Sequence, residues 1–490
     1  MGPGGGARSA LALVLLLVAC ARNPVTGRPE LVLVSSRTEQ EVGREEARKV
    51  EALMGLASHE GAQAWVREIG RRLAEHSPRQ DVTYSFAVVD LPEPNAFSLP
   101  GGPVYVSRGL LAMANAEDEV AGVIAHEIAH IAARHVVSRV TLTTPFAIVV
   151  GIPAAIVGSL SRTLGRVVAA PGALAGGLVL ASHSRSQELQ ADRIAMELVA
   201  RAGWDPAALS VILVNLERED TLRRRTPRRT RFFDSHPSTA DRLQQVAREA
   251  ASVERVAPRR IAAERASLLA RLDGLLLGEN PAYGVFAGSR FLHPELDFSV
   301  DFPEAWEAQN QPTSVVAVAP ESGGETFVLL QLVAESDNPL DGARADAVDE
   351  RLLEGLAPRH VNGLPAIRLV TEQGGTAFDL TWIAHGGVVY RIAGVTPSAG
   401  ATSQRARLLR VAESFRPLAA EDRASIRESR LRSGSVAPGE GLAEFLARTG
   451  SDWSPETAAI ANGLEGLAAR LRPGELLKLS LPQRHAPPPS

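Results

Sequence analysis

The chain has 490 residues, which is too long for one compact hydrophobic core, so several domains are expected. Apolar residues make up 45% and charged residues 22%, as in ordinary folded proteins, which excludes a wholly disordered chain. With 52 basic against 56 acidic residues, the formal net charge of −4 gives no sign of a nucleic-acid partner, and the single cysteine excludes an internal disulfide framework.

The N-terminus has the pattern of an export signal. An unbroken run of small and apolar residues over 10–19 is too short to span a bilayer but suits the core of a secretory signal. The run ends in Leu17-Val18-Ala19-Cys20, which resembles the lipobox of bacterial lipoproteins. The resemblance implies a signal peptide over 1–19, membrane attachment through lipidated Cys20 and a tether over 20–36. Ala21 favours a lipid-anchored place in the cell envelope, on the periplasmic face of the outer membrane. A plain secretory signal with an incidental cysteine stays open.

Beyond the tether, helical and strand-like patterns alternate. The capping-box pattern Ser36-Arg37-Thr38-Glu39 predicts the start of a helix. The predicted elements follow in chain order: a helix over 36–56, a helix over 62–75, a strand over 82–90, a strand over 104–106, and a helix from residue 117.

Two later segments stand out by composition. Residues 141–182 are almost uncharged and hold two apolar blocks that are each too short to span a bilayer. They are interpreted as core helices, and a flap near the site that dips into the membrane stays open. Residues 222–231 form a basic segment broken by a proline, which favours a solvated loop and leaves room for an acidic partner or a mobile gate.

The chain is therefore predicted to be multidomain. The first domain, over 37–250, is expected to be mainly α-helical with a small β-sheet, and the next, over 286–418, combines strand-like runs with helices. The remaining predicted segments are a helical linker over 251–285, a small third unit over 419–482 and a Pro-rich disordered tail over 483–490.

The strongest chemical signal is His126-Glu127-Ile128-Ala129-His130. Residues four apart lie on one face of a helix, so both imidazoles can bind one Zn²⁺ while Glu127 lies beside them as a general base. His135 follows on the wrong face to complete the same set and is interpreted as structural. A distant carboxylate is therefore needed, and Glu188 offers one, with Asp192 one turn further to accept the other N–H of a ligating imidazole.

This pattern resembles metallopeptidase family 48, the gluzincins that include the heat-shock peptidases, the CAAX prenyl endopeptidases and the periplasmic BepA-type proteases. The matching segments are Asn95 to Gly102, Ser107 to Leu110, the helix with the two histidines, Ser184 to Asp192, and Ser235-His236-Pro237 with Arg242. Position 183, usually aromatic in the family, is a histidine in this chain.

The resemblance implies a zinc endopeptidase with one Zn²⁺ per chain. His126, His130 and Glu188 would bind the zinc, Glu127 would act as general base, and Asp192 would orient a ligand. His236 would stabilise the oxyanion or cap the zinc reversibly. Asn95, Gly102 and Arg242 are candidates for the substrate-binding side.

The last two domains point to binding rather than catalysis. Residues 419–482 resemble a LysM-type ββ-α module, which implies binding to peptidoglycan glycan, although Gly441 stands where the module normally has Thr. A purely structural role for this module stays open. Residues 286–418 look like a PsbP- or Mog1-like α/β sandwich, for which a binding or scaffold role is expected and no second active site.

Three hypotheses follow. The first is a zinc endopeptidase whose substrates are unfolded or misassembled envelope proteins. The second is a latent or non-proteolytic assembly factor whose zinc site is closed by His236. The third makes peptidoglycan the substrate. None of the three involves nucleic acid.

Overall fold

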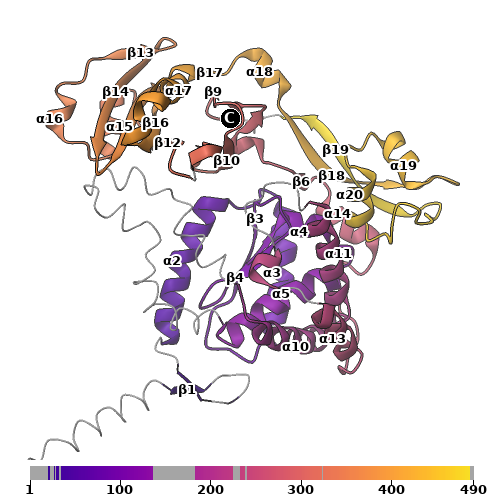
Figure 1. Cartoon of the computed structure of the whole chain (residues 1–490). Helices are drawn as coiled ribbons and strands as arrows, with labels where there is room; N and C mark the ends of the chain where they lie inside the picture. Colours follow the sequence, from indigo (N-terminus) through magenta and orange to yellow (C-terminus); the bar gives the residue numbers. More distant parts are fainter. Residues whose placement is uncertain are drawn as a thin grey trace, which may run out of the picture. The chain divides into compact units, whose positions relative to one another are not determined.

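The structure is a computed structural model in which most of the chain forms two compact units. The described residues are 20–22, 27, 29–31, 35–135, 182–223, 232–237, 240–322 and 324–485. The signal peptide over 1–19, the apolar segment up to 181, most of the basic segment and the end of the Pro-rich tail lie outside them. The first unit takes in the described parts of 1–149, 175–278 and 429–482, and the second takes in those of 279–428 and 483–490 (Figure 1).

The first unit begins with two helices and a small sheet. The sheet has the order β3-β5-β4, with β3 parallel and β4 antiparallel to the central strand β5, so β4 lies at an edge. Helix α3 packs on β3, where the side chain of Gln63 exchanges hydrogen bonds with the backbone of Val88. The bounds are α2 Ser36–Met54, α3 Glu60–Ala74, β3 Ser85–Val89, β4 Ala96–Ser98 and β5 Pro103–Ser107, and a short antiparallel pair, β1 Cys20–Arg22 with β2 Pro29–Leu31, precedes them.

Helix α2 begins where the sequence predicts, but its cap differs. The hydroxyl of Ser35 accepts the N–H of Thr38, and Ser36 is already helical. Glu39 does not turn back to the helix end, because its buried carboxylate pairs with Arg79, which also donates to the carbonyl of Ile131 at the end of helix α5, Glu117–Ala132. A buried charge of this kind needs its partner, so Glu39 acts in the packing of α2 rather than in a capping box.

Helices α10 and α11 pack against α5, every residue of which is buried. Helix α10 lies against α5 and starts with a complete capping box between Ser184 and Gln187, while Gly203 ends it in the left-handed conformation. The bounds are α4 Arg108–Met113, α5 Glu117–Ala132, α10 Arg185–Ala202, α11 Ala208–Leu222, α12 Phe232–Ser235 and α13 Ala240–Ala250.

The C-terminal segment belongs to the same unit. The segment predicted as a helical linker contains one short helix and a two-residue strand, β6, which pairs antiparallel with β18, so its residues join the sheet β19-β18-β6. Helix α20 packs against α11. The bounds are α14 Arg265–Leu272, β6 Leu276–Leu277, β18 Arg427–Ser435, α19 Leu442–Thr449, α20 Pro455–Ala461 and β19 Leu476–Arg484.

The second unit is built on a seven-stranded sheet in the order β10-β11-β12-β16-β15-β14-β13, beside a four-stranded sheet β17-β9-β8-β7. Alternate residues of β16 serve opposite faces: Tyr390 and Ile392 pack with α17, and Val389 and Ala393 pack with α15 and α16. The sheet is thus covered on both sides.

The strands of the second unit are β7 Val285–Ala287, β8 Arg290–His293, β9 Phe298–Asp301, β10 Glu307–Gln311, β11 Ser314–Val318, β12 Phe327–Ala334, β13 Arg359–Val361, β14 Leu364–Gln373, β15 Thr376–His385, β16 Val388–Pro397 and β17 Arg416–Pro417. Its helices are α15 Pro339–Ala345, α16 Glu350–Leu353, α17 Ala401–Ser414 and α18 Ala420–Ser425, with short 3-10 turns at Pro281–Tyr283, Pro320–Ser322 and Ser398–Gly400.

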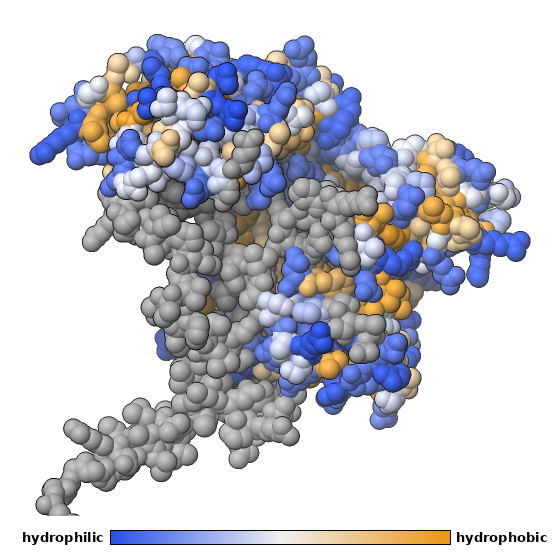
Figure 2. Space-filling model, viewed as in Figure 1, coloured by the Kyte–Doolittle hydropathy of each residue, from blue (hydrophilic) through white to orange (hydrophobic). Residues whose placement is uncertain are grey.

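Within the described residues, no helix is long and apolar enough to cross a bilayer. The face of each unit drawn in Figure 2 is largely hydrophilic, with hydrophobic side chains in smaller groups between the polar ones.

Candidate metal centre

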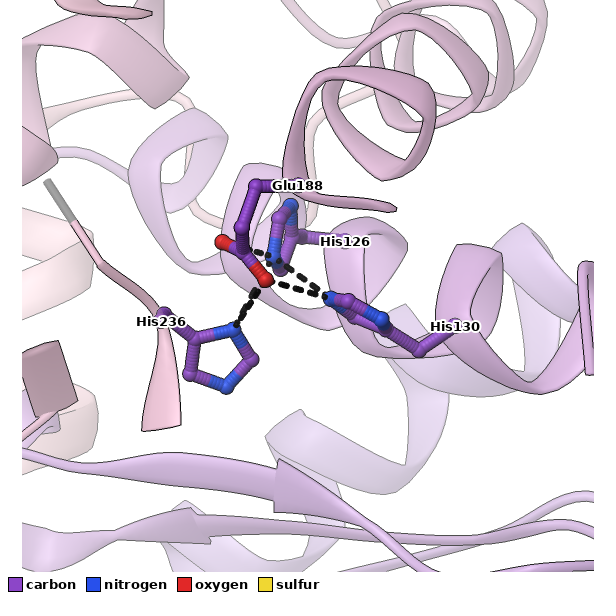
Figure 3. Close-up of side chains that lie close together, drawn as sticks. All are labelled: His126, His130, Glu188 and His236. Atoms are coloured by element: carbon purple, nitrogen blue, oxygen red, sulfur yellow. Dashed lines mark hydrogen bonds and ion pairs between the residues drawn. The ribbon is translucent and has the colours of Figure 1, made fainter. Parts of the chain in front are cut away.

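Four buried side chains from three separate segments converge in the first unit (Figure 3). His126 and His130 project from one face of α5, and Glu188 lies in the first turn of α10. His236 follows directly after α12, where its ring stacks on Phe232. One ligand atom from each of the four residues lies within 4.8 Å of the others.

The spacing of these atoms fits a tetrahedral zinc ion. The Nε2 atoms of His126 and His130 are 3.0 Å apart, and the Glu188 carboxylate oxygens are 3.3 Å from His130 Nε2 and 3.5 Å from His126 Nε2. His236 Nδ1 lies 3.3 Å from His126 Nε2 and 3.2 Å from Glu188 Oε1. Ligand atoms bound to tetrahedral zinc at about 2.0–2.1 Å are about 3.3 Å apart. Two imidazoles and a carboxylate are also the donor set of many catalytic zinc sites, so the residues fit the ion.

A second set of charges lies behind His126. Its Nδ1 is 2.9 Å from Asp192 Oδ1, so the Nδ1–H is donated there and the lone pair of Nε2 faces the cluster. Arg242, from α13, binds Asp192 through two nitrogens at 2.7 and 2.9 Å and reaches Glu188 Oε2 at 2.6 Å. The buried side chain of Arg242 therefore holds the carboxylates of both Asp192 and Glu188 in place.

The electrostatics of the cluster favour a cation. Burial alone would lower the pKa of His126, but the charges of Glu188 and Asp192 outweigh it and raise that pKa to about 9. Burial would raise the pKa of Glu188 too, yet His236 and His126 hold it well below its usual value, and Arg242 does the same for the pKa of Asp192. Both carboxyls are thus kept ionised beside nitrogens that can accept a dication.

Glu127 lies next to this set and is completely buried. The hydroxyl of Ser98, the last residue of the edge strand β4, donates to Glu127 Oε2 at 2.8 Å. Glu127 Oε1 lies 3.3 Å from His236 Nε2. The carboxylate is therefore held from one side by Ser98, and its second oxygen faces the cluster, as a general base requires.

Two of the three candidate substrate residues, Asn95 and Gly102, lie at the sheet, whereas the third, Arg242, lies against Asp192 and Glu188. Asn95 is buried just before β4, where its N–H donates to Ser107 Oγ and its carbonyl accepts the N–H of Ser107. Gly102 has a φ of +132°, and a Cβ there would lie 2.1 Å from the carbonyl oxygen of Thr83. Asn95 thus joins the outer ends of β4 and β5, and Gly102 lies in the turn that connects their other ends, so together they hold the strand that carries Ser98.

Three further residues, His183, His135 and Gln190, lie around His130 and have no role at the metal in the sequence pattern. His183 stacks on the His130 ring with centroids 3.8 Å apart, so it packs where an aromatic side chain is usual. His135 lies 2.9 Å from His130, and Gln190 on α10 lies 3.2 Å from His135. The only sequence feature that could have indicated a role for Gln190 is its place between Glu188 and Asp192.

A pair of packed helices that presents two imidazoles and a carboxylate to one point, with a glutamate beside them, defines the class of zinc metallopeptidases. The model of peptidase family M48 matches residues 60–250, the segment that contains the whole set. This segment is therefore similar to peptidase family M48, whose members are zinc-dependent metallopeptidases.

Curated relatives agree. The mitochondrial metalloendopeptidase OMA1 of Schizosaccharomyces pombe is 31% identical over 229 residues, covering 46% of this chain and 64% of that protein. The beta-barrel assembly-enhancing protease of Escherichia coli K12 is 28% identical over 185 residues, covering 36% of this chain and 37% of that protein. The matches thus span less than two thirds of the length of either relative.

Among solved structures, PsbP from Synechocystis sp. PCC 6803 matches with a TM-score of 0.22 and 13% identity, covering 27% of this chain and 95% of that one. This score is too low to establish a common fold, so the PsbP-like character of the second unit stays a prediction.

Proposed function

We propose that the chain is a zinc-dependent endopeptidase of the bacterial cell envelope that hydrolyses peptide bonds in misfolded or stalled envelope proteins. The observation that carries this proposal is the buried Glu127 beside the convergent ligand atoms of His126, His130 and Glu188. When bound, zinc supplies Lewis-acid chemistry, which polarises a peptide carbonyl and makes water a better nucleophile.

The chain's own residues would handle the proton. Glu127 takes a proton from the attacking water at Oε1 and passes it to the nitrogen of the leaving amine. Ser98 donates to Oε2 of the same carboxylate, so the free oxygen keeps one orientation throughout. Because Glu127 is buried, this transfer takes place away from bulk water. Electrostatic interactions are stronger in such a buried site than in water.

The edge strand β4 supports the binding of an extended peptide. Within the described residues, β4 pairs with β5 on one side only and packs beside α5, so a substrate strand can add to its other side by backbone hydrogen bonds. Backbone pairing accepts many side chains, which suits unfolded segments as substrates. Asn95 and Gly102 would serve this step by holding the two ends of the β4–β5 pair in place.

A latent resting state is favoured by the position of His236. Its Nδ1 lies at the fourth corner of the ligand set, 3.3 Å from His126 Nε2 and 3.2 Å from Glu188 Oε1. A catalytic zinc needs that corner for water or substrate. We therefore propose that His236 caps the site reversibly and moves aside when a substrate binds.

The envelope location rests on the lipobox-like Leu17-Val18-Ala19-Cys20 and on the LysM-like module, which has a small apolar core of its own around Phe445. The name of the similar E. coli protease also refers to β-barrel assembly. Lipid at one end and peptidoglycan at the other would hold the enzyme near exported proteins. Peptidoglycan as the substrate itself is the weaker alternative, and released muropeptides from purified sacculi would favour it.

The test compares the mature chain with its Glu127→Gln variant on unfolded casein, with the zinc content of both determined. We expect equal zinc, cleavage by the wild type, and a loss of about 10²–10⁴-fold in the variant, because the amide cannot accept the proton. His360→Gln, a change in the second unit, is the matched control and should keep full activity. Equal zinc without cleavage by either protein would refute the protease and leave the assembly-factor alternative.

A further inference from the structure

His135 occupies a position that helical periodicity does not describe. Helix α5 ends at Ala132, and Arg134 adopts a left-handed φ of +56°. This conformation is rare for a residue with a side chain and reverses the direction of the chain. As a result His135 turns back toward the helix that it follows, and its Nδ1 lies 2.9 Å from Nδ1 of His130. Both rings are buried.

The hydrogen bond between these two rings has a defined donor and a defined acceptor. His135 Nε2 lies 3.2 Å from Gln190 Oε1, and a carboxamide oxygen can only accept a hydrogen bond. His135 therefore carries its proton on Nε2 and presents a lone pair at Nδ1. That lone pair accepts the Nδ1–H of His130, so the lone pair of His130 is left at Nε2, the atom that faces His126 and Glu188.

A second metal ion among His130, His135 and His183 is the competing explanation, since ligand atoms of these three buried rings also lie within 4.8 Å of one another. The His183 ring, however, stacks on that of His130 at 3.8 Å with 29° between the planes. A ring nitrogen binds a metal in the plane of its ring, and two nearly parallel planes do not direct their lone pairs to one ion. The hydrogen bond to His135 also occupies His130 Nδ1.

We propose that His135 and Gln190 are positioning residues that fix the tautomer and the ring orientation of the zinc ligand His130. Asp192 does the same for His126, so the two ligands are supported differently, one by an anion and one by a neutral imidazole. A neutral partner orients His130 without adding a fourth carboxylate to a site that already buries Glu127, Glu188 and Asp192. The proposal rests on the zinc site of the proposed function, but neither on cleavage nor on the identity of the substrate.

The test measures zinc affinity by competition with a chromophoric chelator, together with the visible spectrum of the cobalt-substituted protein. His135→Phe should weaken zinc binding about 10–100-fold and alter the cobalt spectrum. His135→Gln places a carboxamide oxygen near His130 Nδ1 and should restore most of the affinity. Gln190→Leu should weaken binding and Gln190→Glu, which keeps an acceptor, should not. His293→Phe, which removes a buried imidazole from the second unit, is the control.

Equal losses in His135→Phe and His135→Gln would mean that packing and not the hydrogen bond matters, and would overturn the proposal. So would zinc binding by Gln190→Leu and His135→Phe that stays within about threefold of the wild type, far below the loss expected for a lost orienting partner. If His135→Phe does not fold, the two Gln190 variants decide. A wild-type chain that binds no zinc would overturn the metal site and this proposal together, whereas one that binds zinc but cleaves nothing would refute only the protease, because the affinities would still be measured.

Discussion

The chain contains two lysines, and they provide a matched test of how the C-terminal segment is held. Lys478, in β19, is completely buried, and its Nζ donates to the carbonyl oxygens of Ala112 and Ala114 at 2.8 and 2.7 Å. These carbonyls stand at the end of α4, where the last carbonyls of a helix have no intrahelical partner. Burial holds the pKa of Lys478 well below its usual value.

Lys478→Met keeps the length of the side chain and removes both hydrogen bonds. A buried acceptor without a donor costs about 1–3 kcal/mol, so two of them predict a loss of roughly 2–6 kcal/mol in the free energy of unfolding of the first unit. For a unit of this size, 1 kcal/mol lowers the Tm by about 2–4 °C, which gives a fall of about 4–24 °C. The loss should be concentrated at α4 and β19.

The assay is differential scanning calorimetry of the wild type, Lys478→Met and Lys49→Met, with hydrogen exchange to locate the change. Lys49 is half exposed and pairs with Glu45 and Glu46 on the surface of α2, so its loss should cost no more than about 0.5 kcal/mol. Equal small shifts in the two variants, or unchanged protection of α4 in Lys478→Met, would refute the reasoning that the C-terminal segment is anchored by this amine.

Three further outcomes are expected. Burial lowers the pKa of His293 to about 4 from 6.5, so the second unit should lose stability, up to about 3 kcal/mol, as the pH falls from 6.5 toward 4; denaturant unfolding should show a flatter pH dependence in His293→Gln. Gly43→Ala would place a Cβ 1.8 Å from the carbonyl oxygen of Pro100 and should cost about 1–3 kcal/mol in thermal unfolding, whereas Gly355→Ala, whose Cβ would meet its nearest atom at 3.8 Å, should cost little. His236→Ala should raise casein hydrolysis if the histidine caps the site, and a lower rate would instead assign it to the oxyanion.

The local part of the site could be predicted from the sequence, because helical spacing alone places two residues four apart on one face. His126 and His130 needed no knowledge of the rest of the chain, and the segment around Glu188 follows from the family pattern. His135 could not be placed in this way. A helical projection puts it on the wrong face, but the helix ends at Ala132 and the left-handed Arg134 reverses the chain.

Contacts between segments far apart in the sequence could not be predicted either. The strand β6 has only two residues, and it is a strand only because β18, some 150 positions later, lies beside it. In the sequence, Lys478 looks like an ordinary residue of a terminal strand. Its hydrogen-bond partners, the carbonyls of Ala112 and Ala114, lie more than 360 positions away. No local pattern carries this information, because propensity describes the segment itself and not what packs on it.

The buried charges explain why the site suits a divalent ion. Glu127, Glu188 and Asp192 are buried together with one guanidinium, that of Arg242, so the carboxylates exceed the fixed positive charge by two. Uncompensated buried charge is costly, and in the metal-free chain the raised pKa of His126 offsets part of it with a proton. A dication cancels both charges and takes the place of that proton at nitrogen. The neutral hydrogen-bonded series from His130 through His135 to Gln190 fits this charge balance. A carboxylate in place of His135 would leave the zinc-loaded site negative again.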